Sequence, residues 1–319
     1  MIRHLHNVSR GRLADFLIET WALQGREGFL LSSPDSAECG TEHALDESCG
    51  VRYRFRWMPH REIRGDVAAL ERRGILNPRR DESRLFRDPR DPHGRHCFLC
   101  APNIHECHPM ERLIPLRLAG HDYYAGANFA WIERDHFTVM AAEHVDQLYA
   151  RHTLDAMLAL HAQTGGRFRV LFNGPGAGAS IPWHLHYQIT TQPMPIEQMN
   201  PDGEAAYPTS VRRFRVATGG VEQAHAMAAA WLQRDPARHS INILIAGAVV
   251  DAWIFVFPRD RERATATNKG LVGGFEVAGD FVLSSPQEEW AFRHASAATA
   301  RTILEQICPE DRAPDTRVA

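Results

Sequence analysis

The sequence of 319 residues predicts an α+β fold with antiparallel sheets flanked by helices. Two patterns support this class, and the composition supports a folded protein. Segments with apolar residues at alternate positions follow one another closely, as in antiparallel meanders. Segments with a helical period adjoin these strands in both halves of the chain. Apolar residues make up 44% of the sequence and charged residues 24%, which is typical of a folded globular protein.

The N-terminal part predicts one helix and one strand. Ser9 is a candidate N-cap for a helix over about 10–23, where apolar residues fall on one face. Residues 50–57 alternate with period two and predict a half-exposed strand. Residues 76–96 are rich in Arg, acidic residues and Pro, with few apolar residues, so we expect an exposed connector there.

The middle of the chain predicts five strands around one helix. The strands are expected at 112–118, 128–133, 136–141, 167–173 and 183–191. The helix is expected over about 144–163, and a Gly-rich turn at 174–180 separates the last two strands.

The C-terminal part repeats the mixture of helices and strands. A helix is expected at 221–234, followed by strands at 240–247, 251–257 and 274–283. Ser285 and Glu288 form a capping-box pattern with Pro286 at the first helical position. A final helix is therefore expected from 286 to about 307.

Composition excludes several classes of function. The net charge of −3 gives no basic footprint for nucleic acid. No apolar run approaches the roughly 20 residues of a membrane span. The first residues contain no apolar h-region, so we expect a cytoplasmic protein.

The six cysteines do not predict a disulfide scaffold in a chain of this length. Cys97 and Cys100 form a C-x-x-C pair, which in a cytoplasmic protein indicates metal or redox chemistry. A thioredoxin-like redox role is the weaker interpretation, because the pair opens no recognisable βαβ unit.

The segment from Asn173 to Gln188 carries the clearest chemical signal. In a strand, His184, His186 and Gln188 point to one face, because side chains alternate with period two. The small residues just before them allow backbone N–H groups to approach an anion. A His-x-His pair alone is more often half of a metal site or a chance feature of the surface. Together with the loop, it favours an imidazole nucleophile that attacks phosphorus beside an amide-lined anion site.

This segment resembles a known signature. Asn173, Gly178-Ala179-Ser180 and His184-x-His186-x-Gln188 are similar to the motif of the transferase branch of the histidine-triad superfamily. That branch contains galactose-1-phosphate uridylyltransferase, the diadenosine tetraphosphate phosphorylases and the GDP-sugar phosphorylases. Residues 97–103 and 141–144 resemble the zinc-binding segments of the uridylyltransferase. Residues 242–245, 253–259 and 274–280 are more like the phosphorylases.

The resemblance implies two histidine-triad-like halves, a catalytic one at 97–200 and a second one at 220–310. Residues 1–96 would form an N-terminal extension and connector. His186 would be the nucleophile that takes the nucleotidyl group, and Gln188 would hydrogen-bond the phosphoryl oxygens. The substrate-binding residues implied by the resemblance are Asn173, Gly178, Ala179 and Ser180 around the phosphates, and Asn103 and Asn128 near the base, ribose or phosphates.

The implied activity is nucleotidyl transfer through a covalent nucleotidyl-histidine intermediate. The donor would be a nucleoside diphosphate-sugar or a dinucleoside polyphosphate, and the acceptor a sugar phosphate or inorganic phosphate. Three alternatives remain open: a hydrolase of the same superfamily, a phosphorylase restricted to dinucleoside polyphosphates or GDP-sugars, and a non-catalytic nucleotide-binding zinc protein. The expected partner is a nucleotide-containing small molecule, without nucleic acid or membrane, and a homodimer is one candidate assembly.

The resemblance also implies a structural zinc held by Cys97, Cys100, His144 and His184. Two thiolates and two imidazoles suit tetrahedral zinc, and four protein ligands close its coordination sphere. A local set is the alternative, consisting of Cys97, Cys100, His105, Cys107 and His108. A protein without metal is the third possibility.

Overall fold

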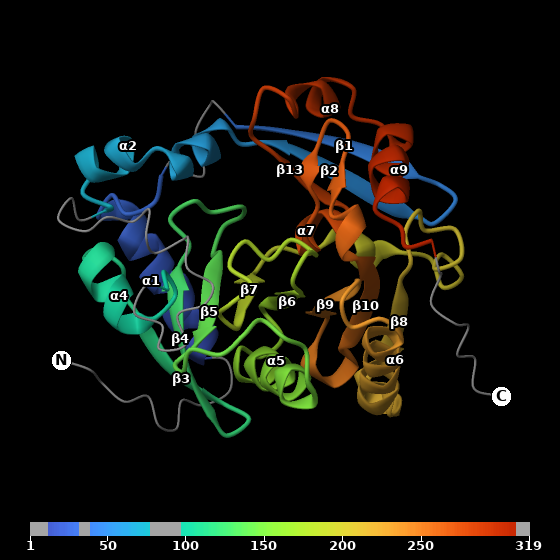
Figure 1. The fold of residues 1–319 in the computed structure, drawn as a ribbon, viewed down its shortest axis with the longest axis horizontal. Helices are drawn as coiled ribbons and strands as arrows, with labels where there is room; N and C mark the ends of the chain where they lie inside the picture. The colour runs from blue at the N-terminus through green and yellow to red at the C-terminus, as the bar shows by residue number, and fades with distance from the viewer. Residues whose placement is uncertain (1–11, 32–38, 77–96, 311–319) are drawn as a thin grey trace.

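The structure, a computed structural model, describes residues 12–31, 39–76 and 97–310. Its largest sheet has eight antiparallel strands: β3 (Ile114–Leu118), β4 (His121–Ala127), β5 (Phe137–Ala141), β6 (Arg169–Asn173), β7 (His186–Thr190), β8 (Arg212–Arg215), β9 (His239–Ala246) and β10 (Trp253–Asp260). They are ordered β3-β4-β5-β7-β6-β9-β10-β8 (Figure 1). The α+β class with antiparallel sheets is therefore confirmed.

Both halves of the chain contribute to this one sheet. Strand β6 of the first half pairs with β9 of the second, from Val170↔Ile245 to Asn173↔Asn242. Every residue of β9 is buried, because the strand lies inside the sheet and both of its faces are covered. The two halves are thus joined by main-chain hydrogen bonds.

Helices and a second sheet cover the two faces of the large sheet. Helices α5 (Arg151–Gln163) and α6 (Gly220–Arg234) pack below it in Figure 1, and the short helix α7 (Gly274–Val277) packs above. Beyond α7 lies a three-stranded sheet of β1 (Gly40–Asp46), β2 (Val51–Trp57) and β13 (Asp280–Leu283). The other α-helices and strands of the described residues are α1 (Arg12–Arg26), α2 (Val67–Arg72), α4 (Ala101–Cys107), β11 (Thr265–Ala266), β12 (Gly270–Leu271), α8 (Glu289–Arg293) and α9 (Ala297–Gln306).

A buried charge network joins the N-terminal strand β2 to the C-terminal strand β13. Asp280, fully buried, accepts from Arg56 through both carboxylate oxygens at 2.7 and 2.8 Å and from Arg54 at 2.7 Å. Glu133 pairs with both arginines from the other side, at 3.0 and 3.4 Å. Arg56 also donates to the carbonyl of Ile132, which fixes the turn that follows β4.

The backbone ladder between β6 and β7 stops two residues before β6 ends and two residues short of the start of β7. Its last pair is Leu171↔Gln188. Continued by two residues, the register would place Asn173 opposite His186. There the buried Gln147 lies between the strands: Oε1 accepts from the N–H of His186 at 2.6 Å, and Nε2 donates to the carbonyls of Asn173 and His186 at 2.9 Å. These three backbone groups therefore keep hydrogen-bond partners where the strands diverge.

Most of the predicted elements are confirmed, with shifts of a few residues at their ends. They are the helices at 10–23 and 221–234 and the strands at 50–57, 112–118, 136–141, 167–173, 240–247 and 251–257.

The strand predicted at 128–133 is wrong, because these residues form the turn between β4 and β5. Asn128 Oδ1 accepts from the N–H of Ala130 at 3.1 Å, and the N–H of Asn128 donates to the carbonyl of His136 at 2.9 Å. A side chain that bonds its own backbone in this way competes with strand pairing.

The helix predicted over 144–163 begins only at Arg151. Before it, the chain is held to the segment that leads into β7, because the N–H of Leu185 donates to the carbonyl of Val145 at 2.7 Å. The N–H of Gln147 likewise donates to the carbonyl of Pro182 at 3.1 Å. These two tertiary bonds replace the first two turns of the predicted helix.

The strand predicted at 274–283 is instead the helix α7 followed by β13. Glu276 caps α7 through Oε2, which accepts from the N–H of Gly273 at 2.8 Å. Gly279 then turns the chain with a φ of 91°, a conformation that favours glycine.

The final helix predicted over 286–307 is interrupted, giving α8 and α9. Ser296 starts the second helix as an N-cap whose side chain accepts from the N–H of Thr299 at 3.1 Å. The predicted N-cap at Ser9 and most of the connector at 76–96 lie outside the described residues. Among the described helices, none combines the length and apolarity that crossing a membrane demands.

We predict that Asp280→Asn lowers the free energy of unfolding by about 3–5 kcal/mol, because it leaves two buried arginines undercompensated. Burial opposes ionisation, but Arg56 and Arg54 hold the pKa of Asp280 below its ordinary value. Its contribution is therefore complete above the unfolded pKa of about 3.9 and is lost as the pH falls through the folded value. Urea unfolding should show that the difference between wild type and variant shrinks below about pH 4.

The exposed pair Arg215–Asp251 offers a control for this measurement. Asp251→Asn should change the free energy of unfolding by less than about 1 kcal/mol. Equal effects of the two substitutions at neutral pH would contradict the role assigned to Asp280.

We further predict that Gln147→Leu destabilises the fold by at least about 2 kcal/mol, because one buried N–H and two carbonyls lose their partner. Gln163→Leu is the matched control, since its amide makes one exposed bond, to the carbonyl of Arg117. Denaturant unfolding of both variants tests the prediction, and an equally small loss for the two would contradict it.

Candidate active site and metal cluster

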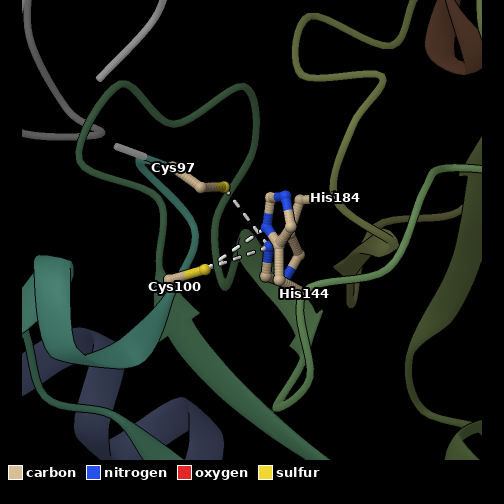
Figure 2. A group of neighbouring side chains, drawn as sticks. All are labelled: Cys97, Cys100, His144 and His184. Carbon is tan, nitrogen blue, oxygen red and sulfur yellow. Dashed lines mark hydrogen bonds between the residues drawn. The ribbon is translucent and has the colours of Figure 1, made fainter. Parts of the chain in front are cut away.

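Four side chains from distant segments meet at the entrance to β7. Cys97 and Cys100 precede α4, while His144 and His184 come from the segments that follow β5 and precede β7 (Figure 2). The sulfur of Cys97 lies 3.3 Å from Nδ1 of His184, and that of Cys100 lies 3.4 and 3.7 Å from Nδ1 of His144 and His184. All four ligand atoms lie within 4.8 Å of one another.

The three sulfur–nitrogen distances fit a tetrahedral metal ion. Zinc bonds of about 2.0 Å to nitrogen and 2.3 Å to sulfur place neighbouring ligand atoms roughly 3.3–3.8 Å apart. Nε2 of His184 lies 2.9 Å from the carbonyl of Ala141, to which it donates, so Nδ1 is free of a proton and turned to the cluster. A hydrogen bond from Cys100 and the nearby His184 lower the pKa of Cys97 to about 4 despite burial, which favours the thiolate.

The alternative local set does not come together among the described residues. His105 is exposed, whereas Cys107 and His108 are buried on the other side of α4. The ring of His108 packs edge-on against Phe29 and Phe98. The described part of the chain holds one group of metal-ligating type, the dispersed Cys97, Cys100, His144 and His184.

His186 opens strand β7 and presents one free nitrogen. Its Nδ1 donates to the carbonyl of His184 at 2.8 Å, so the lone pair remains on Nε2. Nε2 has no partner within the part of the chain that the structure describes. Burial lowers the pKa of His186 to about 4, so the ring is neutral at pH 7. The residue is only 4% exposed.

A cavity of about 470 Å³ lies beside this strand. The residues at one of its sides are those that the sequence assigns to phosphate binding: Asn173, Gly178, Ser180 and Gln188. Gln188 shares a face of β7 with His186, because the two are separated by one residue. His186 itself is not among the lining residues of the cavity.

The loop at this side of the cavity contains backbone hydrogen-bond donors. The N–H groups of Gly178, Ala179 and Ser180 have no partner among the described residues. Asn173 adds a further donor: its Oδ1 accepts from the N–H of Gly274 at 2.9 Å, which leaves Nδ2 for the cavity. A wall of this kind suits an anion and disfavours a cation.

A buried arginine supports this wall from behind. Nη1 of Arg259 donates to Oδ1 of Asn242 at 2.6 Å, and Nδ2 of Asn242 donates to Asn173 and to the carbonyl of Ala177 at 2.8 and 2.7 Å. Because a guanidinium only donates and a carbonyl only accepts, the orientation of both amides is determined. Burial lowers the pKa of Arg259 to about 10, which still leaves it charged at pH 7.

Glycine is required where the loop 174–180 meets the second half of the chain. A Cβ on Gly178 would lie 2.3 Å from the Cα of Gly273, and the φ of Gly178 is +95°. The predicted role of the small residues, backbone access to an anion, is thus combined with close packing against the start of α7.

Other lining residues of the cavity form ion pairs with one another. Lys269, the only lysine of the chain, donates to Glu288 at 2.9 Å and lies 3.6 Å from Glu276. Glu288 in turn accepts from the N–H groups of Ser284 and Ser285. These contacts hold the segment from β12 to α8 over the site.

The structure does not bring Asn103 and Asn128 to this cavity. The amide of Asn103 donates to the carbonyl of Cys97 at 2.6 Å, so the residue supports the backbone of one candidate metal ligand. His184 also differs from the expectation, since it lies before β7 rather than in it and faces the cluster. The shared face of the predicted strand therefore holds only His186 and Gln188.

Three residues at the site carry no sequence signal of their own. Gln147 bridges the diverging strands, and Arg61 lines the cavity near Ile132. His136 is completely buried, and its Nε2 lies 2.6 Å from Oε1 of Gln188. Each is a single polar residue in an otherwise ordinary segment, so only the tertiary structure identifies it.

Comparison with known proteins gives one family and a group of similar structures. Residues 58–191, less than half of the chain, match a family described as a domain of unknown function (DUF4922). No curated protein matches the sequence.

Crystal structures of the yeast Ap4A phosphorylase Apa2 are similar over nearly the whole chain. The complex with AMP has a TM-score of 0.59 and 15% sequence identity, covering 95% of this chain and 97% of that chain. The complex with Ap4A has a TM-score of 0.58 and 16% identity, covering 97% and 98%. The structure without a named ligand gives 0.58 and 15%. At this identity the similarity shows the fold, and the chain has the fold of that phosphorylase.

Proposed function

We propose that the protein is a nucleotidyltransferase that cleaves a dinucleoside polyphosphate through a nucleotidyl-His186 intermediate and passes the nucleotidyl group to inorganic phosphate. The observation that carries the proposal is the cavity lined by Asn173, Ser180 and Gln188, together with a free Nε2 on His186, which shares a face of β7 with Gln188. The fold of a phosphorylase crystallised with AMP and with Ap4A supports this donor over a nucleoside diphosphate-sugar.

The reaction is a double displacement. Nε2 of His186 attacks the α-phosphorus, a phosphorus–nitrogen bond forms, and the bond to the bridging oxygen breaks to release a nucleotide. An oxygen of inorganic phosphate then attacks the same phosphorus, the phosphorus–nitrogen bond breaks, and the histidine returns to its neutral form. The unpaired N–H groups of the loop 178–180 and the amide of Asn173 would stabilise the charge on the phosphoryl oxygens.

Gln188 favours transfer to phosphate over hydrolysis. A neutral amide does not titrate near pH 7 and cannot deprotonate water. Inorganic phosphate arrives already ionised, so it needs no such base. The nucleotidyl-His186 intermediate should therefore be long-lived in water and short-lived with acceptor.

We infer that the cluster of Cys97, Cys100, His144 and His184 binds zinc. With four protein ligands the ion would be structural, and it would hold the α4 segment against the residues that lead into β7. Because His184 precedes the nucleophile by two residues, this anchor supports the position of His186.

The proposed function is tested by mixing purified protein with Ap4A in the absence of phosphate. Intact-mass measurement should show an increase of one adenylyl group, removed by acid and stable to base, as a phosphorus–nitrogen bond requires. Addition of inorganic phosphate should discharge it and release ADP. UDP-glucose and GDP-mannose, each with a hexose 1-phosphate, test the alternative donors in parallel.

His186→Ala should abolish the adduct, whereas the exposed His294→Ala should keep it. An adduct that persists in His186→Ala would disprove the assignment of the nucleophile. Rapid hydrolysis of the donor with no effect of any phosphate acceptor would disprove the transferase.

Metal analysis tests the zinc site. Wild type should contain about one zinc per chain, and Cys97→Ser or Cys100→Ser should lose most of it. Cys308→Ser is the control, because this thiol lies outside the cluster. A full complement of zinc in Cys97→Ser would show that Cys97 is not a ligand.

A further inference from the structure

His136 lies directly before β5 and contacts both the turn after β4 and Gln188 of β7. The N–H of Ile132 lies 3.0 Å from its Nδ1. A backbone N–H only donates, so Nδ1 is an acceptor and the neutral ring carries its proton on Nε2. Nε2 lies 2.6 Å from the side-chain amide of Gln188. The atom that faces His136 must therefore be the oxygen of that amide.

The consequence is a fixed orientation for Gln188. Its Oε1 is held by the Nε2–H of His136, so its own Nε2 is left to donate into the cavity that it lines. The reverse orientation would place two donors against each other at His136 and an oxygen against the phosphoryl group. Since both contacts would be repulsive, the amide is preorganised as a donor.

The groups around His136 keep the ring neutral. Burial lowers its pKa to about 3, and the nearby positive charges of Arg61 and Arg56 act in the same direction. Phe275 packs edge-on against the ring from α7, with 5.6 Å between centroids. The turn that supplies the Ile132 N–H is itself held by the bond from Arg56 to the carbonyl of Ile132.

We propose that His136 is a positioning residue that fixes the amide of Gln188 as a hydrogen-bond donor to the transferred phosphoryl group. It does not touch the substrate and acts only through Gln188. The proposal deepens the proposed function and rests on it for its kinetic consequence, but the hydrogen-bond orientation can be measured independently.

A double-mutant cycle measures the dependence on Gln188. His136→Phe removes both ring hydrogen bonds, and we expect the single-turnover rate of adenylyl transfer from Ap4A to fall by roughly 10- to 100-fold. The dissociation constant for Ap4A should change by less than roughly threefold. His136→Gln, which can still donate to Gln188, should restore the rate to within about fivefold of wild type.

In the Gln188→Met background, His136→Phe should have no further effect beyond about twofold, because the group it orients is already gone. His161→Phe is the matched control: His161 is equally buried, but it bonds the carbonyl of Phe168 away from the site. The factor by which His161→Phe changes the single-turnover rate should be the same in the wild-type and Gln188→Met backgrounds. If the effects of His136→Phe and Gln188→Met also multiply, His136 is merely structural and the proposal is wrong.

Nitrogen-15 NMR of the wild-type protein provides the readout that does not need turnover. The His136 ring should remain neutral, with the proton on Nε2, from pH 8 to about pH 5. Detection of the Nδ1–H tautomer or of a charged ring in this range would overturn the proposal. If Ap4A gives no adduct while the Nε2–H tautomer is found, the proposed function fails and the assigned orientation of Gln188 is supported.

Discussion

The strands β6 and β7 stop pairing at Leu171↔Gln188, and the candidate site occupies the space this leaves. Two strands cannot diverge inside a protein unless their buried backbone groups find other partners. Here one side chain, Gln147, supplies both a donor and an acceptor at the point where the ladder opens. The divergence makes room for the loop 174–185, which lines the cavity through Gly178 and Ser180 and brings His184 to the candidate metal ligands.

The polarity of the site follows from groups whose hydrogen-bonding role cannot change. Backbone N–H groups of Ile132 and Gly274 and the guanidinium of Arg259 can only donate. Through His136 and Asn242, they orient the amides of Gln188 and Asn173 so that both present N–H groups to the cavity. An amide is ambiguous by itself, but these buried networks remove the ambiguity. The result is a wall suited to an anion, with no titrating group in it near neutral pH.

Periodicity in the sequence predicts the helices and strands that are buried on one face or on both, such as α6, β9 and β10. It also places His186 and Gln188 on one face of a strand, since two strand residues that are separated by one residue share a face. It fails where a single side chain decides the backbone path. Asn128 turns the chain where a strand is expected, and Gly279 divides an apolar run into a helix and a strand. The roles of His136 and Gln147 depend on contacts with residues about 40 to 50 positions away, which no local pattern contains.

The ladder between β6 and β9 also limits how the molecule can move. A hinge between the two halves would break main-chain hydrogen bonds in the middle of a buried sheet, at a net cost of about 1 kcal/mol for each. Exchange of ligands with solvent must instead involve the segments laid over the cavity, above all the stretch around Lys269 that is held by two carboxylates. Such segments open on microsecond to millisecond timescales. The barrier to ligand exchange is thus set by a few nearly buried ion pairs beside the cavity rather than by the sheet.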